Sequence, residues 1–325
     1  MAVMPAIAPS RRGLLRLGAW AGAGVALTGC SGERLRTPWS PDPTAAPDGG
    51  REAPDLALLQ QARDRVERYR MLLARTAPPG ARRRQAQELD ELWLVQVERL
   101  DLVMSTLRGG AGDSAPATSD AAADEPAVSS GQPLDLLDVG RQVRDDLPSV
   151  LDGIGRSTPV HRPMLLALAA QHLASAERLG AATDWPALVG PVGTAAVPVL
   201  ATTRPAVFAL EVVAARSEGE ERETYESVLA DLRSVTRSLT TLAGDAAPVP
   251  PLGYDLPEPL ADATERRALA RAVVQDIAPS VLRVGDRASA DTEQVEAYLR
   301  LVMQATLWGA QLGTPEVAFP GMTLP

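Results

Sequence analysis

Residues 225–242 read Tyr-Glu-Ser-Val-Leu-Ala-Asp-Leu-Arg-Ser-Val-Thr-Arg-Ser-Leu-Thr-Thr-Leu. Apolar side chains recur there at alternating intervals of three and four residues: Tyr225, Val228, Leu232, Val235, Leu239 and Leu242. Because an α-helix completes a turn every ~3.6 residues, this spacing collects them in one narrow stripe. Such a stripe is typical of a helix packed in a bundle, so the stretch predicts an all-α fold.

Similar helical signals extend over most of the chain after residue 53. We predict helices at 54–76, 82–108, 134–155, 160–180, 193–216, 219–243, 260–284 and 290–312. Glycines follow several of these segments as C-terminal stops, and no run alternates with period two for long enough to indicate a strand. The sequence therefore predicts two four-helix bundles, at 54–183 and 184–325. Residues 184–205 are apolar but rich in proline, so we interpret them as the join between the bundles rather than a membrane span.

The first 29 residues have the features of an export signal. Arg11 and Arg12 precede an apolar run from Leu17 to Leu27, which is shorter than the ~20 residues needed to span a bilayer. The run ends at Leu27-Thr28-Gly29-Cys30, a lipobox in which the Cys30 thiol receives the lipid. We predict a twin-arginine signal peptide at 1–29 and lipidation of Cys30; export by the general secretory route is the alternative.

Two stretches have compositions that do not support a packed core. Residues 30–53 are rich in Pro, Gly, Ser and Asp, which predicts a flexible tether behind the lipidated cysteine. Residues 109–133 are small, acidic and without period, which predicts a disordered loop inside the first bundle.

The charge of the chain limits its partners. Removing residues 1–29 takes away three arginines and no acidic residue, so the net charge changes from −9 to −12. An acidic surface repels nucleic acid and anionic headgroups, so we expect no nucleic-acid partner. Attachment to the outer face of the cytoplasmic membrane is expected through the lipid on Cys30, whose two acyl chains suffice for anchoring.

The chemistry of the chain can be tested against the enzyme most often built from a four-helix bundle. A di-iron site needs inward glutamates and Glu-x-x-His pairs. The only histidines are His161 and His172, and neither has a glutamate three residues before it. Glu91 and Glu98 fall nearly opposite the apolar face of their helix, which carries Leu89, Gln96, Leu100 and Leu107. No nucleophile or nucleotide motif was found either, so we expect no catalytic residue, no metal and no cofactor.

Two residues remain as candidates for a pocket. His172 shares a helical face with Leu165, Leu168 and Leu179 and should point inward. It is either a core histidine bonded to a neighbour or a ligand or pocket residue. Glu211 flanks an apolar stripe, where it is either paired with an arginine at the bundle boundary or a metal ligand.

The C-terminal half resembles a known family. Phe208-Ala-Leu-Glu-Val-Val-Ala-Ala-Arg216, Gly253-Tyr-Asp-Leu-Pro257, Ala305-Thr-Leu-Trp308 and Val317-Ala-Phe-Pro-Gly321 are similar to segments of a ferritin-like family of unknown function. Its members are found in envelope lipoproteins of GC-rich Gram-positive bacteria. The resemblance covers roughly residues 203–322, and residues 54–180 look like a weaker ferritin-like companion. It implies ferritin-like bundles and an envelope location, but no activity.

These observations together predict a membrane-anchored extracytoplasmic lipoprotein with a non-enzymatic binding or scaffolding role in the cell envelope. Its expected partner is another envelope protein. A metal-dependent oxidoreductase or metal-binding protein is one alternative. A small-ligand carrier, with its pocket near His172, is the other.

Overall fold

The computed structural model describes residues 54–109, 134–257, 259–288 and 291–323, all within one compact unit that spans residues 50–325. Over these residues the chain is all-α, with no strand and one isolated β-bridge between Thr76 and Leu134. The helices are α1 (Leu56–Ala74), α2 (Gly80–Gly109), α3 (Leu136–Asp145), α4 (Leu147–Arg156), α5 (Arg162–Arg178), α6 (Ala196–Ala215), α7 (Gly219–Ala243), α8 (Ala263–Gln275), α9 (Ile277–Leu282) and α10 (Thr292–Gln311). Short 3₁₀ turns lie at η1 (Gly193–Ala195), η2 (Gly244–Ala246) and η3 (Gly285–Arg287).

The apolar stripe from which the fold was predicted lies in α7. Its residues Tyr225, Val228, Leu232, Val235 and Leu239 are buried, and they face mainly α6. The all-α prediction is therefore confirmed. The signal peptide, Arg11, Arg12, Cys30 and the tether lie outside the described residues, as does nearly all of the predicted loop at 109–133.

Two predicted helices are each broken into two. The segment predicted at 134–155 divides at Asp146 into α3 and α4, and the segment predicted at 260–284 divides at Asp276 into α8 and α9. Pro148 and Pro279 follow the breaks. Since proline has no N–H and its ring clashes with the carbonyl four residues earlier, a continuous helix cannot pass through either position without distortion.

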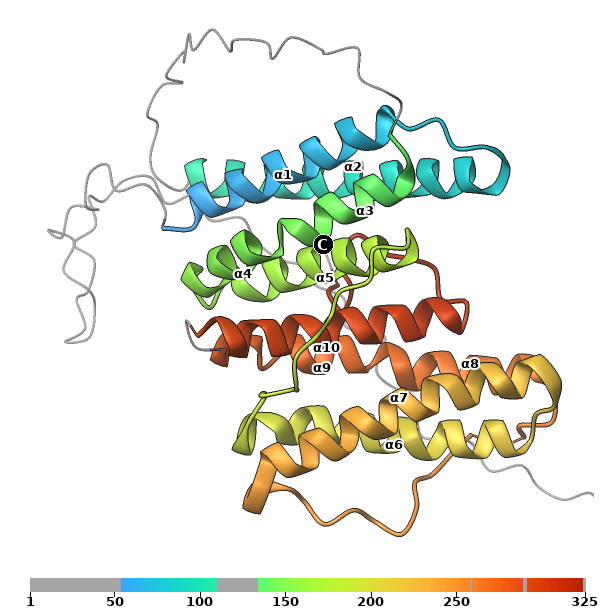
Figure 1. The fold of residues 1–325 in the computed structure, drawn as a ribbon. Coiled ribbons are helices and arrows are strands. Elements are labelled where there is room, and N and C mark those ends of the chain that lie inside the picture. The colour runs from blue at the N-terminus through green and yellow to red at the C-terminus, as the bar shows by residue number, and fades with distance from the viewer. Residues whose placement is uncertain (1–53, 110–133, 258, 289–290, 324–325) are drawn as a thin grey trace, which may run out of the picture. The chain divides into compact units, whose positions relative to one another are not determined.

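The same order of elements occurs twice along the described chain. In each half, a pair of long helices (α1–α2, α6–α7) precedes a proline-broken helix (α3–α4, α8–α9) and a final helix (α5, α10). Both breaks are followed by Pro-Ser-Val-Leu, at 148–151 and at 279–282. The two final helices α5 and α10 pack against each other, between α1–α2 and α6–α7 (Figure 1).

The two halves are also joined by Arg162, a guanidinium that is only 8% exposed. It donates hydrogen bonds to the carbonyls of Ser157 (2.6 Å) after α4 and of Asp286 (3.1 Å) and Ala288 near η3. Carbonyls at helix ends carry partial negative charge, which explains why a buried cation is tolerated there.

α6 belongs to the core although its composition is that of a membrane helix. Among the described residues, the segment Gly193–Ala215 is the one helix long and apolar enough to cross a membrane. Its side chains Val199, Leu200, Leu210 and Val213 are fully buried against neighbouring helices. Pro205 lies inside the helix, so the second half of the segment predicted as a join, from Ala196 onward, is helical.

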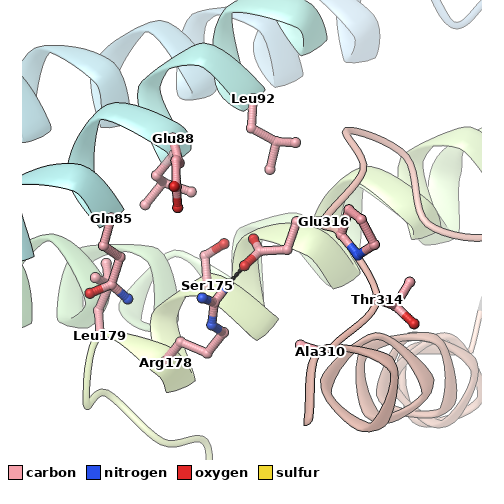
Figure 2. Close-up of a pocket in the computed structure, with 11 residues that line it drawn as sticks. Gln85, Glu88, Leu92, Ser175, Arg178, Leu179, Ala310, Thr314 and Glu316 are labelled. Carbon is pink, nitrogen blue, oxygen red and sulfur yellow. Dashed lines mark ion pairs between the residues drawn. The ribbon is translucent and has the colours of Figure 1, made fainter. Parts of the chain in front are cut away.

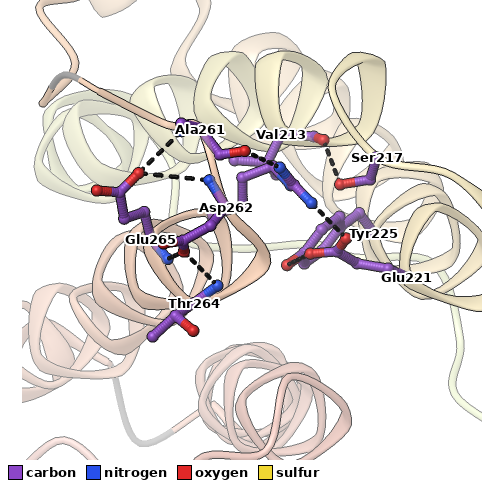
Figure 3. A network of polar contacts seen from close by, with 9 residues as sticks. Val213, Ser217, Glu221, Tyr225, Ala261, Asp262, Thr264 and Glu265 are labelled. Carbon is purple, nitrogen blue, oxygen red and sulfur yellow. Dashed lines mark hydrogen bonds and ion pairs between the residues drawn. The ribbon is translucent and has the colours of Figure 1, made fainter.

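Polar contacts tie α7 to the start of α8 (Figure 3). Arg266 donates to the Glu221 carboxylate at 2.8 Å, and the Tyr225 hydroxyl donates to the same carboxylate at 3.0 Å. Asp262 caps α8 by accepting from the backbone N–H of Glu265, whose side chain in turn accepts from the N–H of Asp262. This reciprocal capping box fixes the start of α8, so we assign these polar contacts a structural role.

Candidate functional site

A buried polar network lies where α1, α2 and α5 meet. Its side chains are Trp93 and Gln96 from α2 and Gln171, His172 and Ser175 from α5, all at most 4% exposed. The inward orientation predicted for His172 is therefore confirmed, as is the predicted outward orientation of the helix face that carries Glu91 and Glu98.

Each amide in this network has a definite orientation. Gln96 Nε2 donates to Gln171 Oε1 (2.9 Å) and to the Ala318 carbonyl (2.8 Å), so its oxygen accepts from His172 Nε2 at 2.8 Å. Gln171 Oε1 also accepts from Trp93 Nε1 at 3.1 Å, while Gln171 Nε2 donates to Ser175 Oγ at 2.8 Å. The network therefore fixes the proton of His172 on Nε2 and leaves Nδ1 without one.

Aromatic rings enclose the imidazole of His172. The Tyr69 and Trp93 rings both meet it edge to face, with centroids 5.3 and 5.9 Å away. The Tyr69 hydroxyl donates to Asp146 at 2.8 Å, and burial together with that carboxylate raises the pKa of the phenol. Burial, with the charge of Arg65 as a smaller cause, lowers the pKa of His172 to about 3. The imidazole is therefore neutral at physiological pH.

The space beside His172 is small. A hollow of about 20 Å³ between α1, α4 and α5 adjoins the imidazole. A water molecule needs roughly 10–15 Å³, so this hollow has room for a water but not for an organic ligand.

The network offers two amides, an imidazole, an indole N–H and one hydroxyl, but no carboxylate. Among the described residues, no three His, Cys, Asp or Glu side chains gather in a way that could hold a metal ion. Asp146, which accepts from the Tyr69 hydroxyl beside the network, is also paired with Arg68 at 2.6 Å. The side chains present thus do not fit a di-iron centre, whose ligands are glutamates and histidines.

A buried carboxylate, Asp55, closes the turn before α5. It accepts from the Thr158 N–H at 2.9 Å and from the Thr158 hydroxyl, and it pairs with His161 Nδ1 at 2.7 Å. Burial raises its pKa, but the bonds from Thr158 and His161 outweigh burial and lower it overall. These side-chain contacts join the start of α1 to the turn before α5, so we assign Asp55 a structural role.

Glu211 lies on the surface of α6, half-buried. Its carboxylate accepts from Arg233 on α7 at 2.6 Å, and both side chains are more than two-fifths exposed. This is the arginine pairing weighed for Glu211 in the sequence. It lies on a different pair of helices from His172, so the structure does not bring the two candidates together.

A groove opens on one side of the polar network. It has a volume of about 400 Å³ and is bounded by α2, α5, the end of α10 and the segment after it (Figure 2). Glu88 and Leu92 project into it from α2, and Ser175 lies on its floor. Arg178 and Glu316 form an ion pair across it. Because Ser175 belongs to both, the network extends from His172 to the wall of the groove, which has the size of a small-molecule site.

Sequence reasoning did not find most of this site. Gln96 was placed on the apolar face of its helix, but no role was given to it, to Gln171 or to Trp93. The signal available was a glutamine in an apolar stripe, since a buried amide needs partners.

The second half of the chain is similar to a known family. A family model described as a domain of unknown function (DUF4439) matches residues 195–324. Residues 195–324 are a DUF4439 domain. The DUF4439 domain contains α6–α10 and the C-terminal segment that walls the groove. It includes the region, roughly 203–322, for which a family of unknown function was predicted. No curated protein and no solved structure matches the chain.

Proposed function

We propose that the chain is an extracytoplasmic lipoprotein, held at the outer face of the cell membrane by lipid on Cys30, with a non-enzymatic binding role in the cell envelope. In this proposal both halves are degenerate ferritin-like bundles. The observation that carries it is the neutral network of Gln96, Gln171 and His172. These side chains occupy the interior where a metal-binding ferritin-like bundle would gather carboxylates, and they satisfy one another.

The groove between α2, α5 and α10 favours a role as a small-ligand carrier. Its volume of about 400 Å³ falls in the range of ligand pockets, and it mixes apolar walls with a few polar groups. The hollow beside His172 is too small for this role, so the pocket proposed here is the groove and not the immediate surroundings of the imidazole.

The anchoring half of the proposal is tested by the Cys30→Ala variant of the full chain, expressed in a host that processes lipoproteins. We expect the native chain in the membrane fraction and in the detergent phase of a Triton X-114 partition. Cys30→Ala should move to the aqueous phase, because one thioether-linked diacylglycerol supplies the whole attachment. Equal membrane retention of both chains would refute lipid anchoring at Cys30.

The export route is tested separately by replacing Arg11 and Arg12 with lysine. Export through the twin-arginine system should then fail, and the precursor should accumulate inside the cell with its signal uncleaved. Unchanged processing would show that the general secretory route exports the chain, and it would leave the anchoring proposal intact.

A further inference from the structure

A small polar pocket lies within the DUF4439 domain, where α7, α8 and the end of α10 meet. Its volume is about 180 Å³, and it shares no lining residue with the groove. It adjoins the polar contacts of Figure 3, because Glu221 and Tyr225 line it from α7. The remaining lining residues are Thr224, Arg267, Arg271, Gln311, Leu312 and Gly313. We call it the arginine pocket.

Two arginines on α8 supply the positive charge of this pocket. Arg267 and Arg271 are four residues apart, so they lie on the same face of the helix. Among the described residues neither forms an ion pair, and Arg267 has no hydrogen bond either. Burial is the largest cause that raises the pKa of Tyr225 to about 12, and the charge of Arg267 acts in the opposite direction. Arg267 therefore lies near the α7 wall with its charge uncompensated.

Arg271 is held in position by the end of α10. Its Nε donates to the Leu312 carbonyl at 2.6 Å. Gly313 has a φ of 78°, and an added Cβ would lie 2.5 Å from Nη2 of Arg271, so the guanidinium packs directly against the glycine backbone. The N–H groups on Nη1 and Nη2 have no partner among the described residues. A guanidinium that is already immobilised loses little conformational freedom when a ligand binds to it.

The carboxylate that lines the arginine pocket already has its donors. Glu221 accepts from Arg266 at 2.8 Å and from the Tyr225 hydroxyl at 3.0 Å, and the bond from Arg266 is the main reason why its pKa is lowered. Its charge is thus compensated by an arginine outside the pocket lining. The whole chain carries a net charge of −9, so unpaired guanidiniums in one pocket are a local exception. Such a concentration of positive charge attracts anions.

The size of the pocket and the shape of its donors select among anions. Organic ligands fill pockets of roughly 300–1,000 Å³, so 180 Å³ suits a small ion or one group of a larger molecule. A guanidinium donates two parallel N–H bonds to a carboxylate or a phosphate. One guanidinium can occupy both oxygens of a carboxylate. A phosphate has further oxygens for a second arginine, so the pair of arginines favours phosphate.

We propose that the arginine pocket binds a phosphate group, either as inorganic phosphate or as the end of a phosphate monoester. Arg267 and Arg271 donate to its oxygens, and the exposed amide of Gln311 donates at the rim. This site goes beyond the proposed groove, and neither depends on the other.

The test titrates the chain from Ser31 onward, which retains the whole compact unit of residues 50–325, at constant ionic strength. The probes are inorganic phosphate, glycerol 3-phosphate and acetate. Calorimetry should show saturable binding of one phosphate group per chain, with a Kd on the order of 1 mM, and at least fivefold weaker binding of acetate. Saturation by only one of the two phosphate probes would support the proposal and identify the source of the group. Saturation by neither probe, or equal affinity for acetate, would overturn it.

Two glutamine substitutions separate the pocket from the overall charge of the chain. Arg267→Gln removes an exposed guanidinium that has no structural contact, and it should weaken phosphate binding roughly five- to twentyfold. Arg237→Gln, at an exposed position of α7 outside the pocket, changes the net charge equally and should change the Kd less than twofold. Equal effects of the two substitutions would refute the site.

Arg271→Gln should weaken phosphate binding at least as much as Arg267→Gln. Because Arg271 also bonds to the Leu312 carbonyl, its melting temperature is measured first; if that variant does not fold, the Arg267 and Arg237 pair still decides. Full phosphate affinity in a folded Arg271→Gln chain would place the phosphate elsewhere. The partition of Cys30→Ala is independent of these results, so failure of phosphate binding with normal anchoring would remove this inference and leave the lipoprotein proposal in place.

Discussion

Replacing Arg162 by methionine should be among the most destabilising single changes in the described part of the chain. The guanidinium is buried, and it bonds to carbonyls of both halves: Ser157 after α4, and Asp286 and Ala288 near η3. Methionine keeps much of the aliphatic volume, so the substitution mainly removes the donors. These three carbonyls, and that of Gly155 at 3.5 Å, then lose a charged partner at once.

The size of the effect follows from the bonds that are lost. Each hydrogen bond to a charged group contributes roughly 1.5–3 kcal/mol. The gain from no longer burying a guanidinium, several kcal/mol, offsets part of that sum. We therefore expect the free energy of unfolding to fall by about 3–5 kcal/mol, the loss typical when one partner of a buried charged contact is removed.

Urea unfolding of the chain from Ser31, followed by circular dichroism, measures this loss. The matched control is Arg156→Met, because Arg156 is 59% exposed and pairs only across one helical turn with Asp152 at 2.8 Å. The control should lose less than ~1 kcal/mol. Arg162→Lys keeps the charge but has fewer donors, so its loss of unfolding free energy should lie between those of the two methionine variants. A difference below ~1 kcal/mol between Arg162→Met and Arg156→Met would refute the proposal that Arg162 joins the two halves.

Three further predictions concern the core and the C-terminal segment. His172 has its pKa lowered to about 3, so its contribution to stability is fully present above about pH 6.5 and is lost as the pH falls toward 3. His172→Gln should therefore flatten the fall in urea midpoint between pH 6.5 and 4, and an unchanged slope would contradict a buried neutral imidazole. Gln96→Met should lower the free energy of unfolding by about 2–4 kcal/mol, because Gln171, His172 and the Ala318 carbonyl each lose a hydrogen-bond partner. The control Gln87→Met, at an exposed position, should lower it by less than ~0.5 kcal/mol. Gly321→Ala combines a φ of 80° with a Cβ only 2.8 Å from backbone atoms of Ala278 and Pro279, so its melting temperature should fall well below that of Gly193→Ala, where φ is 55° and the space is open. Equal melting temperatures of the two variants would show that the C-terminal segment shifts to accept the new Cβ without loss of stability.

The helices were predictable because their signals are local. The stripe through Val228, Leu232 and Val235 needs only the period of a helix, and all three side chains are buried in α7. The breaks at Asp146 and Asp276 were within reach of the sequence too. Pro148 and Pro279 mark both, and the repeated Pro-Ser-Val-Leu after each break shows that the two halves share a pattern.

The site was less predictable because its contacts join distant parts of the chain. Helical phase placed Gln96 and His172 on inward faces, but the phase of a helix does not name the partner across the core. The bond from Gln96 to the Ala318 carbonyl spans 222 residues and depends on how the C-terminal segment returns to α2. The arginine pocket likewise exists only because tertiary packing brings the end of α10 to α7 and α8.

The most direct test of a non-enzymatic role is metal analysis of the chain from Ser31 onward, purified without a nickel column and measured by plasma mass spectrometry. The neutral network of Gln96, Gln171 and His172 predicts well below 0.1 equivalent of iron, manganese or zinc per chain, since amides bind these ions weakly beside carboxylates, thiolates and imidazoles. One or two equivalents of metal per chain, retained through gel filtration, would contradict the account and would put a metal-dependent activity in first place.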